Sequence, residues 1–369
     1  MRIERITLRR IQMPLRHPFR ASFGQEQTKR AIIVAVQSAG LTGYGETPVA
    51  SSPLYSYETT QTAWHIQRDF LVPRLLREEI TRPEQVVKLL SAVRGHPMAR
   101  MGLEAAIWDL LAKARGCSLS QMLGGTRMRI PCGVSIGIQT SLPALIERIG
   151  DFLAEGYRRI KLKIQPGWEL AVVKAVHAEF GDVPLMLDAN AAFTMDDVPL
   201  FQALDAYNLM MVEQPLDHDD LYEHSLLQRQ IKTPICLDES IRHRGDARAA
   251  IEWGSCRIIN IKAARMGGLV EARRVHNLCQ EQGLPVWCGG LLETGVGRAH
   301  NVALASLSNF RLPGDISASD RYFEEDIVHP PFILNPDGTM DVPSGEGIGV
   351  EVKVDLLQRL TVEEAVFET

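Results

Sequence analysis

Five strand-like apolar runs of this chain end in an ionisable residue at an almost constant spacing. The residues are Lys163, Asp188, Glu213, Asp238 and Lys262, separated by 25, 25, 25 and 24 positions. One strand-plus-helix unit of a parallel barrel has about this length. Five successive units would therefore carry an ionisable group to the carboxyl ends of their strands, where barrels of this kind form their active sites.

Short apolar runs alternate with helical patterns from about residue 130 onward, which predicts eight parallel strands. The runs cover 133–138, 160–164, 184–187, 209–212, 234–237, 257–261, 285–288 and, more weakly, 310–316. Helical patterns lie between them, for example over 142–155 and 268–281. We therefore expect an α/β fold, a (β/α)7β TIM-like barrel, over residues 126–320.

The first third of the chain has a different pattern and predicts an α+β capping domain over residues 1–125. Residues 3–13, 31–38 and 41–46 are typical of strands, and an amphipathic helix is expected over 101–114. Residues 321–369 contain several Pro and Gly turns. We expect this C-terminal segment to return to the capping domain and complete it.

Composition excludes several classes of function. Forty Lys and Arg against 45 Asp and Glu give a net charge of −5, and no basic block is present, so nucleic acid is not an expected partner. No apolar stretch is long enough to span a membrane. The six cysteines form no Cys-x-x-Cys pair, which argues against a zinc cluster or a disulfide framework. A cytoplasmic protein is expected.

The three consecutive carboxylates, Asp188, Glu213 and Asp238, predict a metal site. Carboxylates that converge without a cation repel one another. Oxygen ligands without His or Cys suit a hard cation, which we expect to be Mg²⁺, with Mn²⁺ or another divalent cation as alternatives. A network of carboxylates paired with Arg or Lys is the other interpretation. Asn190 and Glu239 are expected to support the ligands.

The lysines on either side of these carboxylates predict proton transfer. Alternation along 160–164 puts Lys161 and Lys163 on one face of the strand. Because helices cover the outside of a closed barrel, both lysines should point into its interior, with Lys262 on the opposite side. A cation could bind a substrate carboxylate while one lysine, its pKa depressed by repulsion, removes the neighbouring proton. Return of the proton from the other side is racemisation, and loss of a β-substituent is elimination.

The motifs around these residues resemble a known family. They cover 159–164, 166–168, 187–190, 212–216, 236–240, 260–268, 286–290, 293–301 and 313–317. The ordered set resembles the enolase superfamily, its muconate-lactonizing-type subgroup, and within that the o-succinylbenzoate synthase/N-acylamino acid racemase family. The resemblance implies Mg²⁺ ligands at Asp188, Glu213 and Asp238, an acid/base pair at Lys163 and Lys262, and a Lys161 that assists the substrate carboxylate.

The same resemblance implies dehydration to o-succinylbenzoate in menaquinone synthesis, racemisation of N-acyl amino acids, N-succinyl ones above all, or both. A homo-oligomer, dimeric or larger, is also implied. Loops over 19–24 and 52–55 should close over the barrel. Expected contacts of a small carboxylate substrate are Phe19, Arg20, Ser22, Phe23, Tyr55, Ser135, Asn190, Gly290, Leu291, Glu293, Ile316 and Ser317. Packing within the cap is the alternative for Phe19, Phe23 and Tyr55.

Two positions qualify the resemblance. Arg265 could tune Lys262 electrostatically or pair with a carboxylate. The segment 315–317 reads Asp-Ile-Ser, whereas dipeptide epimerases of the subgroup usually carry Asp-x-Asp there, so epimerase activity is less expected.

Gly289 and Gly290 are expected to allow a close approach of substrate to the backbone.

Three alternatives to this function stay open. Cycloisomerase activity belongs to the same subgroup. A Schiff-base aldolase could use Lys163 or Lys262 as its nucleophile on the same barrel. A non-catalytic barrel that only binds a ligand should have lost a carboxylate or a lysine, and all five residues are present.

Overall fold

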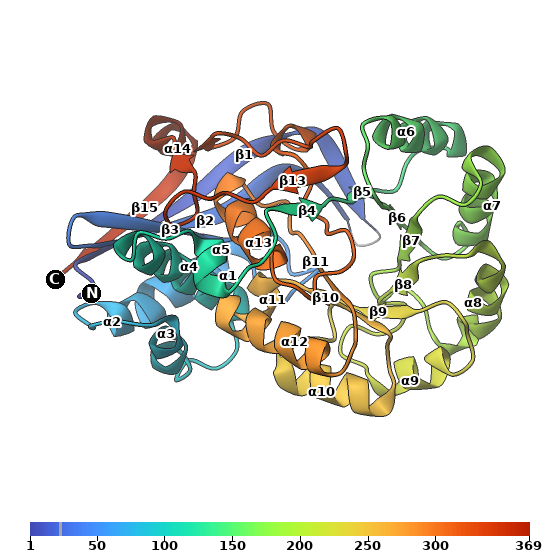
Figure 1. Ribbon diagram of the computed structural model, residues 1–369, viewed down its shortest axis with the longest axis horizontal. Helices are drawn as coiled ribbons and strands as arrows, with labels where there is room; N and C mark the ends of the chain where they lie inside the picture. The colour runs from blue at the N-terminus through green and yellow to red at the C-terminus, as the bar shows by residue number, and fades with distance from the viewer. Residues whose placement is uncertain (22–23) are drawn as a thin grey trace.

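The computed structural model describes residues 1–21 and 24–369, and within them seven short parallel strands form a curled sheet (Figure 1). Their order in the sheet is β11-β10-β9-β8-β7-β6-β5, so each strand pairs with its sequence neighbours. The strands are β5 (Val134–Ile136), β6 (Ile160–Lys163), β7 (Leu185–Asp188), β8 (Met211–Glu213), β9 (Ile235–Leu237), β10 (Ile258–Ile261) and β11 (Val286–Cys288).

The predicted eighth strand is not a continuous strand in the structure, and that detail of the prediction is wrong. Two isolated parallel bridges, Phe310 with Val286 and Gly314 with Cys132, connect this segment to the two ends of the sheet. The segment therefore still closes the barrel. Pro313 lies between the two bridges and has no backbone N–H to donate, which accounts for the interrupted ladder.

Helices cover the outside of the curled sheet (Figure 1). They are α6 (Leu142–Ala154), α7 (Glu169–Phe180), α8 (Val198–Leu204), α9 (Tyr222–Gln228), α10 (Arg244–Trp253), α12 (Leu269–Glu281) and α13 (Gly295–Ala305). The short helix α11 (Ala263–Met266) instead lies against α4 of the N-terminal part (Pro97–Ala114). Along β7, Leu185 and Leu187 belong to the large core shared with these helices, whereas Met186 packs in a separate cluster with Met211 and Trp287. This alternation confirms that successive strand residues face the helices and the barrel interior.

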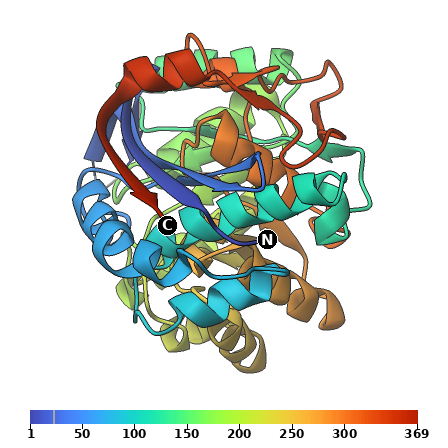
Figure 2. The same cartoon turned by 90° about the vertical axis from the view of Figure 1, so that its left-hand side faces the viewer.

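The N-terminal part forms a four-stranded antiparallel sheet, with strand order β15-β1-β2-β3. The strands are β1 (Arg5–Ala21), β2 (Gly24–Ser38), β3 (Leu41–Thr47) and β15 (Thr361–Glu368). Figure 2 shows β15, in red, beside the blue N-terminal strands. The C-terminal segment therefore completes this sheet, as the sequence predicted.

The remaining elements are short or flank the N-terminal sheet. They are α1 (Thr60–Ile66), α2 (Val72–Leu75), α3 (Pro83–Leu90), α4 (Pro97–Ala114), α5 (Leu119–Leu123), α14 (Val354–Leu360), β4 (Arg129–Pro131), β12 (Val328–His329), β13 (Thr339–Asp341) and β14 (Glu351–Val352). In the described residues no helix combines the length and the apolar character needed to cross a membrane.

Helix α4 is buried on nearly all sides, whereas the sequence predicted an amphipathic helix. Two glycines of β3 explain the difference, because a side-chain carbon at Gly43 or Gly45 would overlap the backbone of α4. The helix therefore lies directly against the N-terminal sheet. On its other side, Glu104 accepts hydrogen bonds from the backbone N–H groups of Leu269 (2.6 Å) and Val270 (2.9 Å), which ties α4 to the start of barrel helix α12.

Candidate active site

The five periodic residues lie at one rim of the barrel. Lys163, Asp188 and Glu213 are the last residues of β6, β7 and β8, and they are direct register partners across the sheet. Asp238 and Lys262 immediately follow β9 and β10. The constant spacing in the sequence therefore corresponds to one structural level, at the carboxyl ends of five adjacent strands.

The carboxylate cluster, formed by Asp188, Glu213 and Asp238, is almost completely buried. Lys161 lies between two of its members, with Nζ 3.0 Å from Asp188 Oδ2 and 3.1 Å from Glu213 Oε2. Burial, together with repulsion from Asp188, raises the pKa of Glu213 to about 8. Burial alone would also raise the pKa of Asp188, but the adjacent Lys163 and Lys161 outweigh it and lower that pKa.

The cluster fits a hard divalent cation. Its donors are carboxylate oxygens from three adjacent strand ends, the ligand type that Mg²⁺ prefers. Burial and repulsion from Asp188 raise the pKa of Glu213, and the neighbouring Lys161 offsets these two effects only in part. Beside it, Glu239 Oε2 is buried without a hydrogen-bond partner in the described residues. These observations support Asp188, Glu213 and Asp238 as the residues that would hold a cation.

Lys163 and Lys262 follow strands that lie far apart in the curled sheet, because three strands separate β6 from β10. Lys163 Nζ is 2.6 Å from Asp188 Oδ2 and 2.5 Å from Asn190 Oδ1. Lys262 Nζ is 2.7 Å from Asp238 Oδ2. Burial would lower the pKa of Lys262, but Asp238 outweighs it and raises the pKa. The expected depression of this pKa is therefore not found, since each lysine has a carboxylate partner.

Tyr55 reaches into the site from the N-terminal part of the chain. Its Oη lies 2.9 Å from Lys262 Nζ, and the ammonium group is 4.4 Å from the centre of the Tyr55 ring. The same hydroxyl is 3.2 Å from Asp238 Oδ2. Arg265 donates to Asp238, to the carbonyl of Ile241 and to that of Asn260. Of the two interpretations of Arg265, pairing with a carboxylate is the one that matches these contacts.

A cavity of about 160 Å³ connects the barrel rim with the N-terminal part. Lys161, Lys163 and Lys262 line its barrel side. Five of the expected substrate contacts also line it: Phe19, Tyr55, Ser135, Gly290 and Leu291. The structure therefore brings the two flanking lysines and the half-buried Phe19 and Tyr55 of the N-terminal part to one cavity.

The other expected substrate contacts do not line this cavity within the described residues. The Arg20 side chain is exposed, and Asn190 donates to Glu239 Oε1 at 2.9 Å. Glu293 accepts a hydrogen bond from its own loop, and Ile316 and Ser317 are buried. The predicted contacts at Ser22 and Phe23 lie outside the described residues.

Asp315 is a site residue that the sequence analysis did not select. It pairs with both Lys161 and Arg159, and it lines the cavity. The indole of Trp287 lies beneath the two cations, 5.1 Å from Lys161 Nζ and 4.6 Å from the Arg159 guanidinium carbon. The available signals were an acidic residue in the weak eighth apolar run and its place in the motif 313–317. Asp315 is therefore a third carboxylate partner of Lys161, in addition to Asp188 and Glu213.

Lys29 of β2 was also missed. It is buried, lines the cavity, and donates to the carbonyl oxygen of Leu291 at 2.7 Å. A lysine in an N-terminal strand carries no signal that would relate it to a barrel loop more than 250 residues away. Its position follows only from how the N-terminal sheet lies over the barrel.

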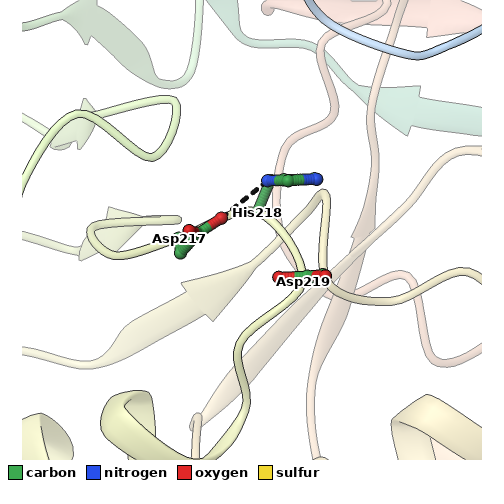
Figure 3. Close-up of side chains that lie close together, drawn as sticks. All are labelled: Asp217, His218 and Asp219. Carbon is green, nitrogen blue, oxygen red and sulfur yellow. Dashed lines mark hydrogen bonds and ion pairs between the residues drawn. The ribbon is translucent and has the colours of Figure 1, made fainter.

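A second acidic group lies on the loop after β8. Figure 3 shows Asp217, His218 and Asp219, whose potential ligand atoms lie within 4.8 Å of one another. His218 Nδ1 is 2.6 Å from Asp217 Oδ1. All three residues are exposed, in contrast to the buried carboxylate cluster. Exposed acidic groups of this kind are common without a cation, because water compensates their charge.

Comparison with known proteins shows similarity over nearly the whole chain. Residues 4–124 match the N-terminal domain of mandelate racemase / muconate lactonizing enzyme, and residues 144–356 match the enolase C-terminal domain-like family. A crystal structure of an enolase-superfamily member from Listeria innocua superposes with a TM-score of 0.96 at 41% identity, covering 100% of this chain and 99% of that one.

Two relatives carry different names. An o-succinylbenzoate synthase from Geobacillus kaustophilus is 51% identical over 360 residues, which is 97% of this chain and 96% of that protein. An N-succinylamino acid racemase from Amycolatopsis is 47% identical over 362 residues, which is 98% of each protein. Both similarities extend over nearly the whole length of each protein.

Proposed function

This chain belongs to the mandelate racemase / muconate lactonizing enzyme family, and from that membership and the site we propose a Mg²⁺-dependent enzyme that forms enolates. Its proposed reactions are dehydration to o-succinylbenzoate and racemisation of N-succinyl amino acids. The single observation that supports the proposal is that Lys163 and Lys262 line one cavity and come from β6 and β10, between which β7, β8 and β9 carry the carboxylate cluster.

The proposed mechanism begins with the substrate carboxylate. Asp188, Glu213 and Asp238 would hold the cation, whose contribution when bound is positive charge near the oxygens that become an enolate. Lys161, held by Asp315, adds a fixed positive charge at the cavity wall. These charges stabilise the negative charge that develops when the α-proton leaves.

Proton transfer is assigned to the two flanking lysines. In racemisation, one lysine in its neutral form takes the α-proton, and the other lysine in its ammonium form gives a proton to the opposite face of the same carbon. In dehydration, the enolate expels a β-hydroxyl group, which takes a proton from an ammonium group and leaves as water. Because both reactions share the enolate, one site can perform both.

The substrate class follows from the names of the relatives and from the cavity. Both relatives are named for reactions of succinyl compounds. The cavity extends from the lysines to the apolar Phe19 and Leu54 and to the buried cation of Lys29, which suits a substrate with a second, elongated arm. A free amino group would find no second carboxylate two residues after Asp315, so a dipeptide is disfavoured.

The test is a comparison of kcat/KM for the dehydration substrate and for several N-succinyl amino acids, with Mg²⁺ and in D2O. We expect turnover of at least one class and deuterium at the α-carbon of the racemised product. Racemisation without solvent exchange would contradict the two-lysine mechanism. Trapping of substrate on Lys163 or Lys262 by borohydride would instead favour a Schiff-base aldolase.

Gly289 provides a second test, because it leaves room for Lys262. A side-chain carbon at Gly289 would lie 2.7 Å from Lys262 Cε and would also overlap the Asn260 amide. We expect Gly289→Ala to displace the lysine and lower kcat by about 10- to 100-fold while the protein stays folded. In the control, Gly150→Ala, the added carbon meets nothing closer than 3.8 Å, and kcat should not change. Equal rates for both variants would remove Gly289 from the mechanism.

Three further expectations belong to this proposal. We propose that residues 1–125 with 321–369 act as the cap and residues 126–320 as the catalytic barrel. A cytoplasmic location and an assembly of two or more copies stay predictions. Light scattering coupled to size-exclusion chromatography would measure the assembly.

A further inference from the structure

A second and larger cavity lies between the N-terminal helices α3 and α4 and three parts of the barrel, namely residues 242–243 before α10, helix α11 and helix α12. Its volume is about 510 Å³, and it shares no lining residue with the cavity of the proposed active site. Arg265 lines it from the barrel side, and the exposed Tyr57 lies at its N-terminal side. The proposed function does not use this space.

The two carboxylates in the wall of this second cavity already have partners. Glu104 accepts hydrogen bonds from the backbone N–H groups at the start of α12 and from Trp108 Nε1. Glu271 accepts from the backbone N–H of Arg244 at 2.8 Å and pairs with Arg274 at 3.1 Å. Both carboxylates are therefore occupied by groups of the protein itself.

The arginines that line this cavity differ in whether they have a carboxylate partner. Arg242 pairs with Asp246 at 3.1 Å, and Arg265 pairs with Asp238. The structure gives the side chain of Arg100 no hydrogen bond or ion pair within residues 1–21 and 24–369, and its Nε is buried. The nearby carboxylate of Glu58 is engaged by the first N–H groups of α4. Arg100 helps to lower the pKa of Glu58 against the rise that burial causes, but it donates no hydrogen bond to that carboxylate. Arg100 is therefore the arginine of this wall without a hydrogen-bond acceptor in the described residues.

Much of the remaining wall is apolar. Val86, Val87 and Leu90 of α3 lie on one side, and Met266 of α11 lies on the other. The partly buried Arg100 lines this cavity, and a carboxylate forms strong, charge-assisted hydrogen bonds with a guanidinium group. We propose that this cavity is a second ligand site, which binds a small carboxylate carrying an apolar group through Arg100.

The site can be tested by calorimetric titration of the full-length, Mg²⁺-loaded protein with 4-phenylbutyrate, and with 4-phenylbutyramide as the uncharged match. A carboxylate can also enter the cavity of the proposed active site. Binding at the second site is therefore identified as the binding event that Arg100→Met removes from the titration. We expect the variant to lose one binding event, or to weaken it by at least about 10-fold, since a charge-assisted hydrogen bond is lost. The amide should bind the wild type at least about 10-fold more weakly than the acid.

Two further variants complete the test. Arg248→Met removes an exposed arginine of α10 and should leave the titration unchanged. Val87→Trp keeps Arg100 but fills part of the cavity, and it should abolish the same binding event. Val87→Trp also decides the outcome if Arg100→Met does not fold. Identical titrations of wild type and both cavity variants, equal affinity for acid and amide, or no binding of the acid at all would overturn the proposal.

Discussion

Alanine at Lys163 or at Lys262 is expected to lower the rate of racemisation by about 10³-fold, because a positioned acid or base contributes an effect of that order. Each variant should still exchange the α-proton of one enantiomer with solvent, since the opposite lysine remains. The two variants should therefore retain exchange of opposite enantiomers. Proton NMR of each N-succinyl amino acid enantiomer in D2O measures this directly.

Lys174→Ala is the matched control, since Lys174 is exposed on α7, outside the cavity. It should retain wild-type racemisation. Calorimetric titration with Mg²⁺ should detect binding in all three variants, because the carboxylate cluster is intact. Wild-type racemisation by either active-site variant would exclude that lysine from the mechanism. Exchange of the same enantiomer by both variants would contradict their placement on opposite sides of the substrate.

Replacing Glu213 by glutamine is expected to weaken Mg²⁺ binding by more than about 100-fold, beyond the effect typical of residues that only support a ligand. Glu213 lies between the other two members of the cluster, and its pKa, raised to about 8, reflects burial beside Asp188. Without a cation, its negative charge is therefore unfavourable. We accordingly expect the cation-free variant to unfold at a temperature no lower than that of the cation-free wild type.

Calorimetry with Mg²⁺ and thermal unfolding with and without the chelator EDTA measure both effects. In the wild type, Mg²⁺ should raise the unfolding temperature, because it binds the folded state. In Glu213→Gln this increase should disappear. Asp219→Asn, in the exposed group of Figure 3, should behave like the wild type. Loss of binding in Asp219→Asn but not in Glu213→Gln would move the cation site to the loop after β8.

The interrupted eighth strand shows that an apolar run in the sequence does not always predict a regular strand. Apolar runs predicted all seven strands of the curled sheet, because a strand buried between helices and the barrel interior needs such a run. The final run over 310–316 has a similar composition, but Pro313 removes a donor from its centre. Only the two bridges in the structure show that it still closes the barrel.

The sequence by itself determined the barrel and the rim with its carboxylates and lysines, because one strand-plus-helix unit repeats at a fixed length and so repeats in space. Only the tertiary structure decided which residues support that rim. Asp315 meets Arg159 across 156 positions, and Tyr55 meets Lys262 across 207. Such contacts depend on closure of the barrel and on the placement of the N-terminal sheet over it. No periodicity of the sequence relates residues that are so far apart and on separate elements. Their pairing could therefore not be predicted from the sequence pattern.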